Sequence, residues 1–445
     1  MVKSISWPLP FGRQDGQFKL DRIKKALNYL DNPEKQMKNV IHIGGTNGKG
    51  SSLAFLEKIF LTSGFTVCSY ISPSLLDLNE RFRVNSLNIS DELLLLNIGE
   101  VRTKLAKHNF ENELTFFEGL TVVAFWIFAK LNYDFNIIEV GLGGRFDATN
   151  AIETKLATLI TQISLDHTEY LGNTHQKIAI EKMQIMRNDA INVVSYQNNK
   201  SVYDVFVNSE FSQNQNLYLF DRDFNLKIKS DNKFFFRSKH FENDIVLQPS
   251  LKGSHQYYNA TNAVFLAKMI AKKIGLNDKI TDSVIAKSIS NTFWLARMQS
   301  VFESKEYEII IDGGHNEGSV FAIFDFIKNN FDTYHSIQII YGALKRKDII
   351  SIAKKLKSDS IENYIENIMF CKINTFEECH NPEYVFETFT NQGFTKIKLL
   401  YDLEMFLKNI TSSKNNNTNT NNKKKLIFVF GSLYLCGEVL TILNN

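Results

Sequence analysis

The sequence predicts an α/β protein, with a mostly parallel sheet in a larger first domain and a smaller α/β domain after it. Short apolar, β-branched runs alternate with segments of helical period from residue 21 onward, and this alternation restarts near residue 294. A chain of 445 residues is also too long for one small core. We therefore expect two domains, covering residues 1–293 and 294–445.

The first domain should open with a helix over Asp21–Leu30, whose apolar residues recur with helical spacing. A second helix is expected over Leu53–Leu61, and the apolar run Gly119–Leu131 is predicted to be a buried helix because a bilayer span needs ~20 residues. Apolar runs of strand length predict strands buried on both faces of a parallel sheet. These strands are Asn39–Ile43, Thr66–Ile71, Asn136–Val140 and Ala157–Ile163.

The pattern changes over Asn216–Val246, where short aromatic and charged pieces predict antiparallel strands outside the main alternation. A helix over His255–Ile274 then leads to a break near residues 291–293. The asparagine-rich segment Thr411–Lys425 cannot bury apolar surface, so we expect a disordered surface loop there. The second domain should contain the strands Glu308–Ile311, Ile337–Tyr341, Ile368–Cys371, Lys396–Tyr401 and Leu426–Phe430.

Composition excludes several classes of protein. The 51 basic and 48 acidic residues nearly balance, and no basic stripe alternates with aromatic residues, which argues against nucleic acid and membrane partners. The four cysteines form no CxxC pair, as expected for reduced thiols. The N-terminal stretch MVKSISWPLPFGRQDGQF lacks the apolar core of a signal peptide. We therefore expect a cytoplasmic protein.

A glycine-rich turn, Gly44–Ser51, joins a predicted strand to a predicted helix. Glycines allow backbone N–H groups to approach phosphate oxygens, and a lysine neutralises the outer phosphates. A plain glycine turn with a surface lysine is the simpler interpretation, but four glycines, a lysine and a hydroxyl in eight residues disfavour it. The spacing differs from GxxxxGK[ST], because Gly50 separates Lys49 from Ser51.

The turn GTNGKGS resembles the phosphate loop of the Mur ligase superfamily, in the form typical of its folylpolyglutamate synthase and dihydrofolate synthase branch. The resemblance continues in the family's order over nearly the whole chain. It is carried by SYISPSLLDLNERFRVN, TFFEGLTVVAF, EVGLGGRFDATN, SLDHTEYLG, IAIEKMQIMR, WLARMQ, IDGGHNEGS, YGALKRKD and GSLYLCGEV. It implies a Mur-ligase-like P-loop domain that binds ATP and pteroate or folate, followed by a Rossmann-like domain of the glutamate ligase C-terminal type.

The resemblance implies two magnesium ions, with ligands at Ser51, Ser72, Glu139, His167 and Lys182. Glu139 ends a predicted buried strand, where open parallel sheets place their ligand sites, although an exposed carboxylate at a strand end is common. Histidine is not a typical magnesium ligand, so chemistry alone would make His167 a hydrogen-bonded or basic histidine.

The resemblance also implies a chemical modification of Lys182. A lysine in the first turns of a helix, beside Glu181, is ordinarily solvated. In this family the lysine of the EKxxI pattern is carbamylated, which turns a cation into an oxygen-bearing anion suited to a metal. The resemblance thus implies N6-carboxylysine at Lys182, and it makes Lys49, His167 and Lys182 the catalytic residues.

Two further sets of residues follow from the resemblance. The ATP-binding set comprises Asn47, Gly48, Lys49, Gly50, Ser51, Asn259, Arg297 and Asp312. The pteroate- or folate-binding set comprises Thr115, Phe116, Phe117, Glu118, Phe146, Asp147 and Ala148. Chemistry alone leaves Arg297 open as an ion-pairing residue and the Phe116–Phe117 pair as core.

The implied reaction is ATP-dependent amide formation. A pteroate or folate carboxylate attacks the γ-phosphate of ATP, and the acyl-phosphate is then attacked by the amino group of L-glutamate. Two alternatives stay open: another Mur-superfamily ligase, of cell-wall peptide synthesis, and a nucleotide-binding regulatory module without catalysis. Within the folate branch the motifs do not decide between dihydropteroate and reduced folates, and bifunctionality is our default. The resemblance also implies a monomer.

Overall fold

The computed structural model describes residues 19–213, 215–229, 232–375, 378–412 and 423–444. These residues form two compact units. One comprises the described residues up to Ser250 together with Gln256–Thr292, and the other comprises Leu251–His255 and the described residues from Phe293 onward. Two segments about which the sequence made predictions lie outside the described residues. They are the N-terminal residues 1–18, expected not to be a signal peptide, and residues 413–422 of the asparagine-rich segment.

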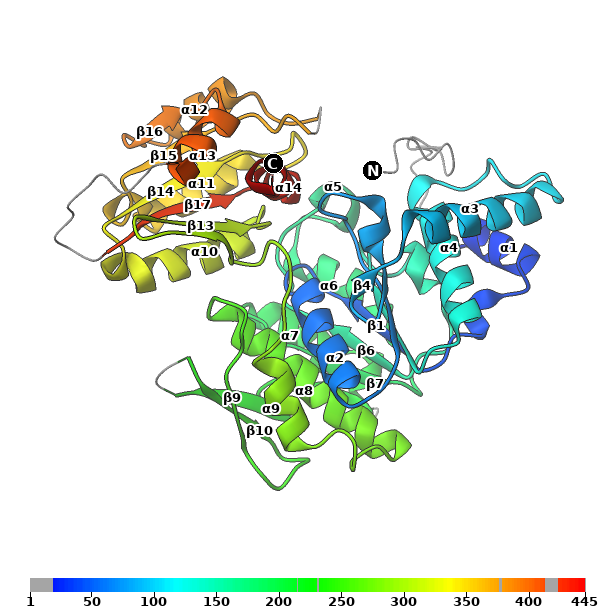
Figure 1. Cartoon of the computed structure of the whole chain (residues 1–445). Helices are drawn as coiled ribbons and strands as arrows, with labels where there is room; N and C mark the ends of the chain where they lie inside the picture. Colours follow the sequence, from blue (N-terminus) through cyan, green and yellow to red (C-terminus); the bar gives the residue numbers. More distant parts are fainter. Residues whose placement is uncertain (1–18, 214, 230–231, 376–377, 413–422, 445) are drawn as a thin grey trace. The chain divides into compact units, whose positions relative to one another are not determined.

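The first unit is built on a sheet in which eight strands are described (Figure 1). The strands are β1 (Val40–Gly44), β2 (Val67–Tyr70), β3 (Phe82–Val84), β4 (Leu87–Asn88), β5 (Phe135–Glu139), β6 (Ala157–Ile160), β7 (Ile191–Val194) and β8 (Leu217–Leu219). Their order is β4-β3-β2-β5-β1-β6-β7-β8. The neighbours in the series β2-β5-β1-β6-β7-β8 pair in parallel. At one edge, β3 pairs antiparallel with both β2 and β4.

Every residue of the central strands β1 and β5 is buried, as the continuous apolar runs predicted. The carboxyl ends of β2, β5, β1 and β6 therefore lie side by side at one edge of the sheet. Because β1 leads directly into the glycine-rich turn, this edge is where the candidate site is assembled.

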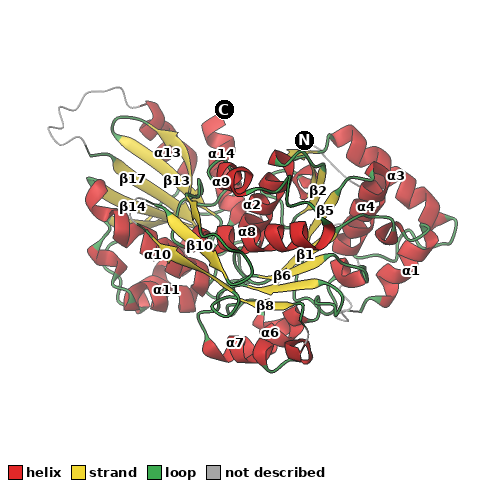
Figure 2. Ribbon diagram, turned by 90° about the horizontal axis from the view of Figure 1, so that it is seen from below, coloured by secondary structure: helices red, strands yellow, loops and turns green. Residues whose placement is uncertain are grey.

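Helices lie on both faces of this sheet, as predicted; Figure 2 shows α8 and α9 on one face of its β6–β8 part and α6 and α7 on the other. The helices of this unit are α1 (Asp21–Tyr29), α2 (Lys49–Thr62), α3 (Asp91–Ala106), α4 (Phe116–Leu131), α5 (Thr168–Leu171), α6 (His175–Met183), α7 (Lys200–Val207), α8 (His255–Ile274) and α9 (Asp282–Ile289). Short 3₁₀ turns occur at Pro33–Lys35, Leu78–Arg81, Ala148–Ala151 and Glu210–Gln213.

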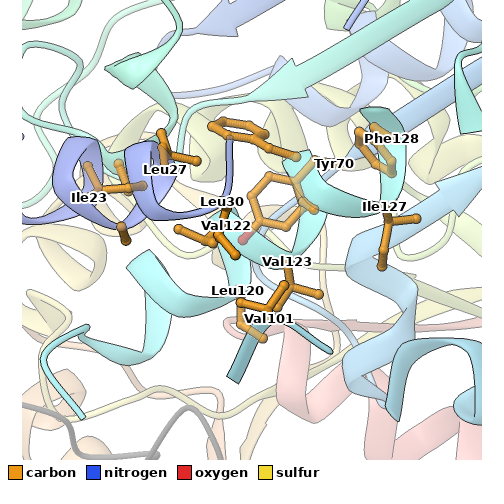
Figure 3. Close-up of a cluster of buried hydrophobic side chains, with 14 of the residues drawn as sticks. Ile23, Leu27, Leu30, Tyr70, Val101, Leu120, Val122, Val123, Ile127 and Phe128 are labelled. Carbon is orange, nitrogen blue, oxygen red and sulfur yellow. The ribbon is translucent and has the colours of Figure 1, made fainter. Parts of the chain in front are cut away.

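The apolar helix α4 is buried, which confirms the prediction for Gly119–Leu131. It begins with a capping box, in which the Thr115 side chain accepts from the Glu118 amide and Glu118 accepts from the Thr115 amide. It ends at Asn132, in the left-handed conformation with φ 53°. Side chains from α1, α3, α4 and β2 share one apolar core (Figure 3).

One prediction about the region 216–246 is wrong in part. The first piece, β8, extends the main sheet in parallel with β7 instead of pairing antiparallel. The remaining pieces form an antiparallel sheet as predicted, from β9 (Phe224–Ile228), β10 (Phe234–Ser238) and β11 (Ile245–Leu247). A short aromatic run does not encode the direction in which a strand will pair.

The second unit has a sheet with six described strands in the order β12-β13-β17-β14-β15-β16. All five predicted strands are present, and the antiparallel edge strand β12 was not expected. The strands are β12 (Gln299–Glu303), β13 (Tyr307–Asp312), β14 (Ser336–Tyr341), β15 (Asn367–Phe370), β16 (Ile397–Leu399) and β17 (Lys425–Phe430). The helices are α10 (Glu317–Asn330), α11 (Ile349–Ser358), α12 (Pro382–Asn391), α13 (Leu403–Ser412) and α14 (Leu433–Asn444), with 3₁₀ turns at Phe331–Thr333 and Ile361–Asn363.

The margins of the asparagine-rich insert differ from the prediction. Thr411 and Ser412 end α13, and Lys425 begins β17. At these margins the segment expected to be a loop belongs to a helix and a strand instead.

Candidate active site

The glycine-rich turn between β1 and α2 needs its glycines for space as well as for conformation. Gly45 and Gly48 have φ angles of 135° and 88°, which L side chains rarely adopt. A Cβ atom at Gly45 would lie 1.9 Å from Thr161 Oγ1, and one at Gly48 would lie 2.3 Å from Asn259 Oδ1. The turn is thus pressed between the segment after β6 and helix α8.

Hydrogen bonds fix one side of this turn. The amides of Thr46 and Asn47 both donate to the Gln162 carbonyl, at 2.9 and 3.1 Å. The Thr46 hydroxyl donates to the Ser164 carbonyl, and the side-chain Nδ2 of Asn47 donates to Ser164 Oγ at 3.3 Å. The turn then enters the N-terminus of α2, a position that favours a bound phosphate.

Lys49 and Glu139 meet at the carboxyl edge of the sheet. Lys49 is the first residue of α2, and its Nζ donates to the Thr46 carbonyl at 3.2 Å. Nζ also lies 3.7 Å from Glu139 Oε1. Glu139 ends β5, the parallel neighbour of β1, so adjacent strands bring the two side chains together.

Lys182 lies in the last turn of α6, not in the first turns of a helix as expected. It is buried, unlike an ordinary solvated lysine of a helix surface. Its pKa is lowered to about 7, mainly by burial and next by the charge of Lys49, while Asp166 and Asp147 act in the opposite direction. An amine with this pKa is substantially neutral near neutral pH, which is the form that reacts with carbon dioxide.

The loop after β5 covers Lys182. A Cβ atom at Gly144 would lie 2.6 Å from the Glu181 carbonyl oxygen and 2.9 Å from Lys182 Cα. The Arg145 amide donates to the Glu181 carbonyl at 3.1 Å. Only a glycine at 144 lets the loop approach this closely, and this approach is what buries Lys182.

His167 follows β6 and caps the short helix α5 with φ 52°, in the left-handed region. Its Nε2 lies 3.8 Å from Asp166 Oδ1 and its Nδ1 lies 3.9 Å from Glu169 Oε1. Non-glycine residues in this conformation concentrate at functional sites. Asp166 was not singled out from the sequence, although the adjacent acid and histidine in SLDH were a signal for it.

The remaining predicted ligand, Ser72, follows β2 and is half-buried. Since β2 is the parallel neighbour of β5, Ser72 lies at the same edge of the sheet as Glu139. Over the described ranges, no three His, Cys, Asp or Glu side chains gather as a metal site. Magnesium commonly takes one or two carboxylates and completes its shell with phosphates and water, so the oxygen donors present fit it without such a cage.

Asn259, a member of the expected ATP-binding set, lies next to the phosphate loop at Gly48. Its Nδ2 donates to Gln256 Oε1 at 3.0 Å, and Gln256 Nε2 donates to Ser51 Oγ at 3.3 Å. Gln256 is completely buried. Sequence reasoning missed Gln256, although its i, i+3 spacing to Asn259 places both on one helix face.

Arg297 and Asp312 lie together within the second unit. The Asp312 carboxylate accepts from the amides of Met298 and Gly314, at 2.9 and 2.7 Å. Arg297 is flanked by Ala296 and Met298, whose φ angles are 52° and 45°. A Cβ atom at Gly313 would lie 2.8 Å from Arg297 Nη1. Asp312 therefore holds the turn that presents the arginine.

At the N-terminus of α4, the polar members of the expected pteroate set make structural contacts. Thr115 and Glu118 form the capping box, and Glu118 also accepts from Arg22 Nε, with its two oxygens at 3.1 and 2.9 Å. The Arg81 guanidinium lies 5.8 Å from the Phe116 ring centre. Phe117 stacks on Tyr70 with ring centres 6.1 Å apart.

The other half of this set lies on the loop after β5, and Phe117 reaches that loop. A Cβ atom at Gly141 would lie 2.4 Å from Phe117 Cζ. Phe146 is 45% exposed, so its ring is accessible to a ligand, whereas Ala148 is buried. The Asp147 carboxylate accepts from the Leu142 amide at 2.8 Å and from Thr149, so its contacts shape the loop. Burial raises the Asp147 pKa, and these hydrogen bonds oppose the rise.

Comparison with known proteins places this site in a family. Residues 296–442 match the family model described as dihydrofolate synthetase, C-terminal domain. A Buchnera aphidicola (subsp. Schizaphis graminum) protein named dihydrofolate synthase/folylpolyglutamate synthase is 31% identical over 96% of this chain and 92% of its own length. The Bacillus subtilis protein of the same name is 29% identical over 97% of this chain and 95% of its own length.

Solved structures have the same fold. Folylpolyglutamate synthase of Mycobacterium tuberculosis superimposes with a TM-score of 0.83, at 22% identity over 97% of this chain and 96% of that one. The enzyme of the same name from Thermotoga maritima gives a TM-score of 0.77, at 27% identity over 96% and 93%. The fold is therefore that of the Mur-ligase-like enzymes, which confirms the predicted class.

The chain belongs to the dihydrofolate synthase/folylpolyglutamate synthase family. It is an ATP-dependent ligase of the folate branch, and the comparisons favour this prediction over a cell-wall ligase. No helix in the described parts of the chain is long and apolar enough to cross a membrane.

Proposed function

We propose that this ligase joins L-glutamate to dihydropteroate and also extends reduced folates through the γ-carboxyl group. The observation that carries the proposal is the Lys49–Glu139 pair beside a phosphate loop, with buried Lys182 near enough for the Lys49 charge to lower its pKa. Two full-length relatives bear the bifunctional name, which supports the double activity. A yeast relative, 27% identical over 96% of this chain, is named only dihydrofolate synthetase.

The first chemical step is attack of the acceptor carboxylate on the γ-phosphate of ATP, giving an acyl-phosphate and ADP. Amides of the turn Asn47–Ser51 bind the phosphates, and Lys49 Nζ balances their charge. The Gln256–Asn259 pair keeps the Ser51 hydroxyl and the turn in place. The glutamate amino group then attacks the acyl carbon, the C–O bond to phosphate breaks, and phosphate leaves as the amide forms.

Two magnesium ions are part of the proposal. Ser51, Ser72, Glu139, His167 and a carbamate on Lys182 would hold them, and bound magnesium supplies Lewis-acid stabilisation of the phosphate charge. The low pKa of Lys182 supports the carbamate. Its neutral amine attacks the carbon of CO2 and releases one proton, which leaves an N-carboxylate. An enzyme of this fold was crystallised with Mn, AMPPNP and L-glutamate, a set that suits binding tests.

The acceptor would lie against the loop after β5 and the N-terminus of α4. We propose that Phe116, Phe117 and exposed Phe146 contact the pteridine, while Thr115, Glu118, Asp147 and Ala148 shape its surroundings. Arg297 and Asp312 are proposed to contact phosphate and the ribose or base. The first unit would thus supply the ATP-loop and acceptor residues, and a monomer is the proposed active form.

A parallel assay tests the acceptor. Purified protein is incubated with ATP, Mg²⁺ and labelled glutamate, with either dihydropteroate or tetrahydrofolate. Amide product from both acceptors supports bifunctionality, whereas product from one alone restricts the enzyme to that acceptor. ATP binding without amide product from either would contradict the proposed function and favour a regulatory module.

A further inference from the structure

A polar cluster of two buried residues and one half-buried residue lies at the end of α6, the helix that carries Lys182. It consists of Lys155, Asn150 and Arg187, and we call it the Asn150 cluster. Lys155 is 3% exposed, and its Nζ donates to Asn150 Oδ1 at 2.7 Å. Arg187 Nη2 donates to the same oxygen at 3.0 Å. A lysine amine and a guanidinium thus converge on one amide oxygen, an arrangement that is costly to bury.

The cluster binds the carbonyl groups that follow α6. Lys155 Nζ donates to the Ile185 carbonyl at 2.9 Å. Arg187 Nη1 donates to the carbonyls of Gln184 and Met186, at 3.0 and 2.8 Å. Carbonyl groups at a helix C-terminus lack partners within the helix, and cations are favoured there. The end of α6 is therefore fixed two to four residues beyond Lys182.

The same cluster also binds the loop after β5. Asn150 Nδ2 donates to the Arg145 carbonyl at 3.1 Å and to the Gln184 carbonyl at 3.3 Å. One amide group thus joins the loop that contains Gly144 to the segment that ends α6. The loop already touches α6 at Lys182 through Gly144, so Asn150 supplies the second point of attachment.

We propose that Asn150 and Lys155 are positioning residues, which set the place of Lys182 relative to Glu139 and the loop Gly141–Asp147. The proposal rests on the function proposed above for Lys182. Asn150 is held at Oδ1 by Lys155 and Arg187, so its Nδ2 points at the two carbonyls that must stay together. Neither positioning residue touches a reacting atom. Asn150 acts through the carbonyls of Arg145 and Gln184, and Lys155 acts through the Ile185 carbonyl.

Asn150→Asp separates positioning from mere stability. The carboxylate keeps Lys155 and Arg187 as partners, and this offsets the loss of the two hydrogen bonds from Nδ2, so the thermal midpoint should change little. It cannot donate to the carbonyls of Arg145 and Gln184, so the loop and α6 should separate. We expect kcat to fall by about tenfold or more with both acceptors, since small displacements in a catalytic site are costly. The KM for ATP should stay within about twofold.

Two further variants keep the test decisive. Lys155→Met removes a buried charge at similar volume, so it should fold while losing the contact with the Ile185 carbonyl and lowering kcat. Asn136→Asp is the matched control: Asn136 is completely buried and donates to the Lys38 carbonyl at 2.7 Å, at the opposite end of β5. It should lower the thermal midpoint and leave kcat per folded molecule unchanged.

A second readout does not depend on turnover. With ¹³CO2, the carbamate signal of Lys182 in NMR spectra should be weakened or shifted in Asn150→Asp and unchanged in Asn136→Asp. Wild-type kcat and an unchanged signal in Asn150→Asp and Lys155→Met would overturn the proposal. A wild-type protein with no carbamate signal, or a fully active Lys182→Ala, would instead overturn the role proposed for Lys182, so the two failures can be told apart.

Discussion

The ammonium of Lys49 lies 3.7 Å from the Glu139 carboxylate, and the charge of the same ammonium acts on buried Lys182. The Glu139 carboxylate balances the positive charge of Lys49. A second positive charge nearby, on Lys182, is disfavoured, and this is why the Lys49 charge lowers the Lys182 pKa. Binding an anion, or converting Lys182 into one, removes the repulsion between the two lysines. The two lysines therefore favour a bound phosphate and a carbamate at the same site.

Lys182→Ala should lower kcat by about 10²-fold or more, because it removes a group that would hold charge at the transition state. Added bicarbonate should not restore the variant, whereas short carboxylates that fit the vacated space should restore part of the rate. Steady-state kinetics with and without acetate or propionate provide the measurement. Near-wild-type turnover without any added carboxylate would falsify the carbamate role.

The stability of the CO2-free protein should depend on Lys182. Its pKa is about 7 when folded and near the ordinary lysine value when unfolded, so the unfolded chain binds more protons between these values. The free energy of unfolding should therefore rise with pH above about 7, by at most ~1.4 kcal/mol per pH unit from this group. Urea unfolding of wild type and Lys182→Met at pH 7, 8 and 9 measures the difference. Lys155 also has a lowered pKa, but it is present in both proteins, so its contribution cancels in the comparison. The same dependence of unfolding free energy on pH in both proteins would contradict the prediction.

The order of strands explains why much of the site could be predicted. Glu139 ends a strand, while Ser72, the phosphate loop and His167 each follow one, and in a parallel sheet such positions meet at one edge. The burial of Lys182 could not be predicted, because it depends on Gly144 bringing a distant loop onto α6. In its own segment, a lysine beside a glutamate has the pattern of a solvated helix face.

Gln256, Asp166 and Lys155 were missed for a related reason. Each acts through a partner far away in the sequence: Gln256 through Ser51, Asp166 through Lys182, and Lys155 through Ile185. Periodicity predicts which face of an element is apolar, but it does not say which polar group will be enclosed with which. The structural contacts of Glu118 and Asp147 escaped prediction in the same way.

Gly48→Ala should weaken ATP binding more than it destabilises the fold. An alanine there is strained at φ 88° and would collide with Asn259 Oδ1. Gly64→Ala is a matched control, because φ is 85° at Gly64 but no atom lies within 4 Å of the added carbon. Both variants should lose about 1 kcal/mol of stability from the strained φ angle, and Gly48→Ala should lose more because Asn259 must also move. Calorimetric titration with AMPPNP should show at least about tenfold weaker binding for Gly48→Ala only; equal affinities in the two variants would count against the close approach.

Arg22→Met should impair the acceptor side of the reaction and spare the nucleotide side. Arg22 holds the largely buried Glu118 carboxylate, and its loss leaves that charge with only the capping contact at the start of α4. The turn that carries Phe116 and Phe117 should shift, so the KM for the pteroate or folate acceptor should rise by about tenfold while the KM for ATP stays unchanged. Lys24→Met on the same helix is the control, because its ion pair with Glu153 is exposed and contributes little. Equal rises in both KM values for Arg22→Met, or the same acceptor defect in Lys24→Met, would show that Arg22 does not act through the acceptor site.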